Sequence, residues 1–212
     1  MHAQNGEAVR ALSGLRQLKL LPLSPTAQCY VAVYEAHAHA SAKCLALALQ
    51  ALDAAAAWSD ETRNEAPPSW LGIPGTSFVE RQRGMILAQF GTTQAIPQLH
   101  RLEQNESAVF RRYRVTLATD LALTYAHSKE VEQSAEQLTS ALQLNQQTRS
   151  VDRTRRILKI RAMLDPYQNS RAVRSLDEAL TKENGSSWKF ELCLTWVNAL
   201  QGVQRPAFSL VR

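Results

Sequence analysis

Histidine, cysteine and acidic residues are the side chains best suited to bind metals or perform catalysis, and here the histidines are few. They occupy positions 2, 37, 39, 100 and 127. His37 and His39 are two residues apart, so on a helix they point in different directions and do not chelate one metal ion. We therefore expect no metal site, and interpret these histidines as buried or groove-facing polar residues.

The sequence patterns that mark common enzyme sites are missing. The chain has no glycine-rich phosphate loop, no nucleophile elbow and no HExxH motif, and no Ser/His/Asp trio can be nominated. Cys29, Cys44 and Cys193 are far apart, which is typical of free thiols in a reducing compartment and not of a disulfide framework. We expect a cytoplasmic protein that is not an enzyme and needs no cofactor.

The composition favours an all-α fold. Hydrophobic residues make up 45% of the chain, while glycine and proline number only 8 each. The plentiful Ala, Leu, Gln, Glu and Arg are the best helix formers. The net charge of +5 permits an anionic partner without predicting one. Polar residues interrupt every long apolar stretch, so we expect no membrane span.

Helical periodicity divides the chain into a series of helices. After an N-terminal helix and connector (1–25), Ser24 or Thr26 can cap the next helix, with Pro25 in its first turn. Ser128 is a plausible cap further on. Three prolines and two glycines in 58–77 predict a loop that Trp58 and Trp70 could anchor. The expected helices pair as 27–39 with 43–56, 78–90 with 94–104, 107–127 with 130–145, and 149–164 with 169–182.

Small residues recur at matching places in the first and third pairs. The spacings are 12, 4 and 3 in both, whereas the middle pair begins at Gly84, turns at Gly91 and places its next small residue, Ala95, one position early. Antiparallel helices approach closely only where side chains are small. An Ala-rich bundle without true repeats is the alternative. The matched residues are Ala36, Ala48, Leu52 and Ala55, and Ala122, Ser134, Leu138 and Ala141.

This pattern resembles the tetratricopeptide repeat, a unit of about 34 residues. The runs EAHAHA at 35–40, LQALD at 49–53, and the stretches 111–144 and 150–180 resemble the sensor region of actinobacterial helix-turn-helix transcriptional regulators that carry such repeats. The resemblance covers roughly 9–181. It implies a right-handed superhelix of hairpins, an α-solenoid, with three hairpins in 26–147, an insertion at 58–77 and a capping helical pair at 148–183.

Two features depart from that family. We expect no DNA-binding domain, because about 25 residues before the first hairpin are too few for one. The tail at 184–212 also does not look like the family. We therefore expect a module that binds a peptide or protein, with a homodimer possible, and that is related to the sensing part of a regulator. A free-standing adaptor and a helical enzyme with an unrecognised pocket are the alternatives.

Basic residues around Tyr113 and along 149–161 leave two interpretations open. They could form an anion- or nucleic-acid-binding patch, or a solvated helix face whose aliphatic stems pack along the core. We expect no specific nucleic-acid binding. The resemblance implies instead an inner groove lined by the first helix of each hairpin, at Tyr30, Val33, His37, Ser41, Phe78, Arg81, Met85, Gln89, Thr119, Leu123 and His127.

Overall fold

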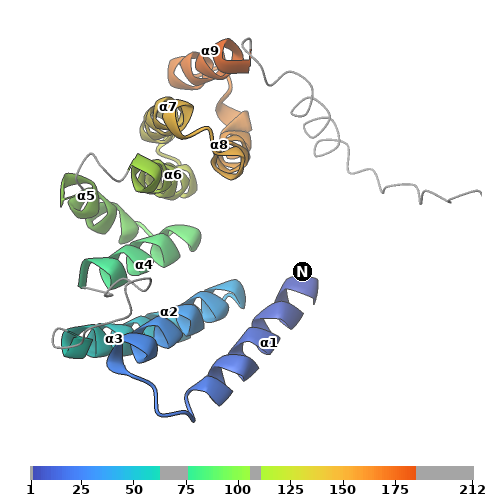
Figure 1. Cartoon of the computed structure of the whole chain (residues 1–212). Coiled ribbons are helices and arrows are strands. Elements are labelled where there is room, and N and C mark those ends of the chain that lie inside the picture. Colours follow the sequence, from blue (N-terminus) through green and yellow to red (C-terminus); the bar gives the residue numbers. More distant parts are fainter. Residues whose placement is uncertain (1, 63–75, 106–110, 185–212) are drawn as a thin grey trace, which may run out of the picture.

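All regular structure in the described parts of the chain is helical. A computed structural model describes residues 2–62, 76–105 and 111–184. The helices follow one another along a curved row (Figure 1). They are α1 (His2–Leu18), α2 (Pro25–Ser41), α3 (Leu45–Glu61), α4 (Thr76–Gln89), α5 (Ala95–Asn105), α6 (Arg111–His127), α7 (Val131–Thr148), α8 (Val151–Met163), the 3₁₀ turn η2 (Asp165–Tyr167) and α9 (Arg171–Asn184).

The helices pack in sequence order. α2 packs on α3, α4 on α5, and α6 on α7, so the three expected hairpins are present. The first helix of each new pair lies against both helices of the pair before it: α4 on α2 and α3, α6 on α4 and α5, and α8 on α6 and α7. α9 packs on α7, and α1 packs on α2. Each interface therefore joins neighbours in the row.

The small residues of the repeated pattern lie where paired helices come closest. All eight matched residues of the first and third pairs have no exposed surface. The Ser134 hydroxyl donates a 2.9 Å hydrogen bond to the carbonyl of Ala122 across the α6–α7 contact. In the middle pair, a Cβ added to Gly84 would lie 2.8 Å from Cδ2 of Leu99, so a larger residue would require the Leu99 side chain to move. The sequence pattern therefore marks real helix–helix contacts.

The turns inside the three hairpins share one backbone geometry. Lys43, Gly91 and Lys129 have φ values of 63°, 67° and 63°. Each follows the first small residue of its hairpin by seven positions. The next residue in every case donates its N–H to a carbonyl five residues back, over 2.9, 3.2 and 2.9 Å. These are Schellman turns. The middle hairpin therefore turns at the same place as the others, and its one-residue shortening comes after the turn.

Replacing Lys129 with glycine is expected to stabilise the protein. A side chain in the left-handed region costs about 1 kcal/mol that glycine does not incur. We expect Lys129→Gly to raise the free energy of unfolding by up to about 1 kcal/mol, measured by urea denaturation. Lys159→Gly, at an exposed position inside α8, is the control and should lower it by about 1 kcal/mol. A loss of stability in Lys129→Gly would contradict the turn geometry.

Several boundaries differ from those expected. Ser24 caps α2, accepting a 3.3 Å hydrogen bond from the N–H of Ala27, as one of the two expected alternatives. The cap expected at Ser128 is wrong, because its hydroxyl donates to the Thr124 carbonyl and the N-cap of α7 is Glu130.

The loop expected at 58–77 is wrong at both ends of its range. Helix α3 continues to Glu61 and α4 begins at Thr76, so both ends of that range are helical. Trp58 lies in α3 and packs against the apolar core between α2, α3 and α4. Trp70 falls outside the described residues, as does the tail at 185–212. The alanines that continue the apolar pattern of α3 as far as Trp58 explain the longer helix.

Candidate functional site

The inner face of the row begins on α2, where side chains point away from α3. Tyr30, Tyr34, His37 and Ser41 are at least partly exposed there. The side chain of Tyr34 is 62% exposed, whereas Val33, which we expected to face a ligand, is only 4% exposed. Val33 packs in the core between α2, α3 and α4. Val33 therefore belongs to the core, and Tyr34 takes its place on the inner face.

The expected residues of α4 face the same side and contact neighbouring helices. Phe78 packs against the ring of Tyr30, with centroids 5.3 Å apart. The guanidinium of Arg81 lies 3.9 Å from the centroid of the Tyr113 ring on α6. Met85 is half-buried and Gln89 is exposed. These contacts join α4 to both of its neighbours in the inner layer.

The expected residues of α6 are less available to a ligand. Thr119 is 1% exposed and donates its hydroxyl to the Thr116 carbonyl over 2.8 Å. Leu123 packs against the core shared by α6, α7, α8 and α9. His127 is exposed, and its ring packs against the Gly91 turn, where an added Cβ would lie 2.6 Å from its Cγ. Thr119 is therefore a core residue, and His127 supports a turn.

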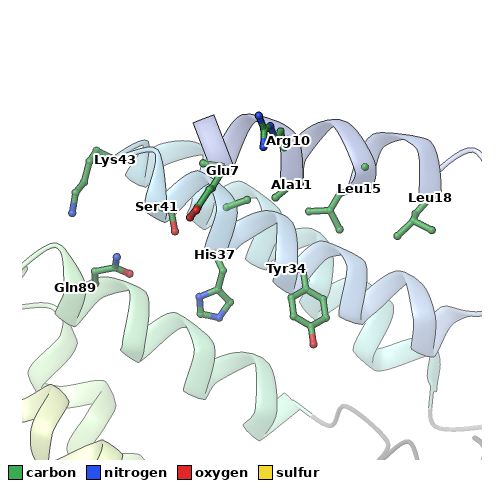
Figure 2. Close-up of a pocket in the computed structure, with 13 residues that line it drawn as sticks. Glu7, Arg10, Ala11, Leu15, Leu18, Tyr34, His37, Ser41, Lys43 and Gln89 are labelled. Carbon is green, nitrogen blue, oxygen red and sulfur yellow. The ribbon is translucent and has the colours of Figure 1, made fainter. Parts of the chain in front are cut away.

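A groove lies between α1 and the inner face of α2 (Figure 2). Its volume is about 690 Å³, within the range that small-molecule and peptide sites occupy. Three of the expected residues, His37, Ser41 and Gln89, line it. The others come mainly from α1, and the complete lining is Glu7, Ala8, Arg10, Ala11, Gly14, Leu15, Leu18, Tyr34, His37, Ala38, Ser41, Lys43 and Gln89.

Helix α1 forms one wall of this groove because it packs on α2 without covering it. Ala8 is buried against α2, and Lys19 forms an ion pair with Glu35 at the other end of the contact. Leu15 and Leu18 are directed toward the side on which Tyr34 lies (Figure 2). Sequence reasoning treated α1 as a preceding helix with a connector. Its repeated leucines were the available signal that it packs on a neighbour.

The two ends of the groove differ in character. Leu15, Leu18 and the exposed ring of Tyr34 form an apolar end. Glu7, Ser41 and Gln89 lie toward the other end, where the Glu7 carboxylate points into the space between α1 and α2 (Figure 2).

Polar pairs join successive helices along the inner layer. His37 Nε2 lies 2.8 Å from Gln82 Oε1, which links α2 to α4. Asp120 on α6 forms an ion pair with Arg156 on α8. Asp120 is fully buried, and its second oxygen has no hydrogen-bond partner in the described part of the chain. Desolvation raises the pKa of this carboxyl to about 6, although Arg156 opposes the shift. The α6–α8 contact therefore holds a carboxylate in a costly environment.

Arg155, Arg156 and Arg161 in the basic stretch on α8 form ion pairs with carboxylates. Only Asp152 stands among those basic residues in the sequence, and it pairs with Arg155. Arg156 pairs with Asp120, as described above. Arg161 donates to both oxygens of Asp177 over 2.6 and 2.7 Å and to Asp165 over 2.7 Å. For these three residues the pairs favour a role within the fold over an anion-binding patch.

Reactive groups in the described ranges do not gather into a catalytic or metal site. No group of three or more His, Cys, Asp or Glu residues there is arranged to hold a metal ion. Cys29 is buried, and desolvation raises the pKa of its thiol to about 11, so it stays protonated and poorly nucleophilic at neutral pH. His100 instead holds a structural place, with Nε2 3.0 Å from the Tyr125 hydroxyl.

A second groove of about 530 Å³ lies between α7 and α9. Glu132 and Glu136 on α7 and Arg171 on α9 contribute its charges. No helix in the described ranges is long and apolar enough to cross a bilayer. Comparison of the chain with protein-family models, with curated proteins and with solved structures gives no match.

Proposed function

We propose that this protein is a non-catalytic, tetratricopeptide-like α-solenoid that binds a peptide or a protein segment in the groove between α1 and α2. The groove carries this proposal. It combines apolar and polar residues, its volume suits a ligand, and Glu7 and Ser41 form no side-chain hydrogen bond or ion pair within the described ranges. The stacking of each pair on the one before it supports the solenoid, which presents extended inner surfaces of this kind.

The resemblance to regulator sensor regions suggests what binding would do. His37 lines the groove and also contacts Gln82 on α4, so a ligand at His37 acts on the α2–α4 contact. A ligand that binds one curvature of the row better than another shifts the population toward it. In a regulator, that shift would be passed to a DNA-binding domain or to the geometry of a cytoplasmic homodimer. In an adaptor, the same groove would hold a partner without this output.

Peptide display tests the proposal. Random 12-residue peptides would be selected on the full chain and measured by isothermal titration calorimetry. We expect selected peptides to lose at least tenfold in affinity on Ser41→Trp, which fills the groove with an indole. Ser175→Trp is the matched control because it fills the second groove between α7 and α9. Failure to select any peptide, or peptides that respond to Ser175→Trp alone, would overturn the proposed site.

A further inference from the structure

The lining of the groove includes one carboxylate, Glu7, and two basic residues, Arg10 and Lys43. The Glu7 carboxylate points into the space between α1 and α2, on the side where Ser41 lies, while Arg10 is turned to the other side of α1 (Figure 2). Within the described ranges, Glu7 forms no ion pair and Ser41 no side-chain hydrogen bond. Lys43 stands at the end of the groove, with Nζ 5.8 Å from the centroid of the Phe90 ring. Between Glu7 and Ser41, away from the charged ends of Arg10 and Lys43, an incoming cation would therefore meet an accessible anion and a hydroxyl.

The apolar end of the groove is suited to binding apolar side chains of a ligand. Leu15 and Leu18 of α1 and Tyr34 of α2 line it together, and the Tyr34 ring is largely exposed. Burying apolar side chains against them is favourable by about 25 cal/mol per Å². Along α1, Glu7 and Leu15 are eight residues apart, which is about 12 Å at the helical rise. An extended chain covers that distance in about four residues.

The length of the groove sets the length of the ligand. From Glu7 to Leu18 the wall runs about 16 Å. An extended segment of about five residues spans the same length.

We propose that the groove binds an extended segment of about five residues that places a basic side chain against Glu7 and Ser41 and apolar side chains against Leu15, Leu18 and Tyr34. This inference rests on the proposed peptide-binding function and specifies the ligand for the same site. A charge-assisted hydrogen bond at Glu7 sets the orientation of the segment, and the apolar end supplies buried area.

Defined peptides test this proposal by calorimetry at low salt. The probes are KSSLLF and its reversal FLLSSK, both acetylated and amidated, with ESSLLF and FLLSSE as acidic counterparts. We expect one basic peptide to bind at least tenfold more tightly than its acidic counterpart. The version KPPLLF, or its reversal, should retain the affinity, since proline excludes a helix but permits an extended chain.

Substitutions in the groove test which residues contact the peptide. Glu7→Gln should lower the affinity for the basic peptide by roughly tenfold. Glu7→Lys should reverse the preference, so that the acidic peptide binds more tightly than the basic one. Tyr34→Ala should lower the affinity for both the basic and the acidic peptide. Glu132→Gln, an exposed glutamate on α7, is the matched control and should leave affinity unchanged. Circular dichroism melting would verify that each variant folds, which is expected because Glu7 and Tyr34 are exposed.

The possible failures are distinguishable. If the acidic peptides bind as well as the basic ones, or if Glu7→Gln has no effect, the proposed ligand chemistry is overturned. If none of these probes binds while displayed peptides respond to Ser41→Trp, the chemistry is again overturned and the peptide-binding function stands. If display also yields no binder, the function itself fails.

Discussion

Replacing Leu138 with alanine is expected to lower the free energy of unfolding by about 3–4 kcal/mol. Leu138 is fully buried, between the small residues Ser134 and Ala141 of α7. Its side chain belongs to the core that α6 and α7 share with α8 and α9. Truncation removes the burial of a large apolar side chain and leaves a cavity, because α6 and α8 hold the surrounding walls in place.

Urea denaturation followed by circular dichroism would measure this effect. Leu47→Ala is the matched control, since Leu47 lies on α3 with 46% of its surface exposed. We expect that control to change stability by at most about 0.5 kcal/mol. A loss below about 1 kcal/mol in Leu138→Ala would show that the third hairpin is not packed through this residue. Leu52 holds the corresponding place in the first hairpin and is also fully buried, so Leu52→Ala should resemble Leu138→Ala.

The Asp120 carboxyl should make stability depend on pH between about 4 and 6. Its pKa is raised to about 6 from 3.8 by burial, so in this range the folded protein keeps a proton that the unfolded chain releases. The contribution of Asp120 to the free energy of unfolding is therefore complete below about pH 4 and is lost as pH rises through about 6. The size of the pKa shift corresponds to roughly 3 kcal/mol. Asp120→Asn has no proton to lose and should abolish this contribution.

The measurement compares the free energy of unfolding of wild type and Asp120→Asn from pH 4 to pH 7.5. The difference between the two should change by roughly 3 kcal/mol over that range. Arg156, the partner of Asp120, is partly exposed and can be hydrated in the variant. Asp152→Asn removes the exposed partner of Arg155 and should show no such change. Parallel pH curves for wild type and Asp120→Asn would contradict the effect of burial on Asp120.

The hairpins could be predicted from sequence because close helix packing needs small residues at regular spacings. Ala36, Ala48 and their counterparts in α6 and α7 report contacts between helices that are adjacent in the chain. The Schellman turns were visible only at Gly91, because glycine marks a left-handed residue whereas Lys43 and Lys129 do not. Turns formed by lysine carry no compositional signal.

The inner face was predicted with less accuracy, because one residue along a helix turns a side chain by about 100°. Assigning Val33 in place of Tyr34 therefore exchanged a core position for a groove position. The α-helical pattern of α2 alone does not separate the two, since α2 is apolar on most sides. The structure resolves the choice because α3 and α4 cover Val33 and leave Tyr34 open.

Contacts between distant parts of the chain were beyond prediction. Asp120 and Arg156 are 36 residues apart, and Arg161 and Asp177 are 16 apart. Their pairing depends on how α8 and α9 stack on the pairs before them, which no local pattern encodes. For the same reason, sequence reasoning missed the part that α1 plays in the groove.

The attachment of α1 has a consequence for timescales. α1 packs principally on α2, with one small buried residue and one exposed ion pair among its contacts, so it can lift while the rest of the row stays folded. Its amide hydrogens should then exchange with solvent through this local opening, well ahead of those of α6 and α7. The wall that α1 contributes to the groove is lost each time the helix lifts. The lifetime of the α1–α2 contact is therefore an upper limit on how long a molecule stays bound to both walls.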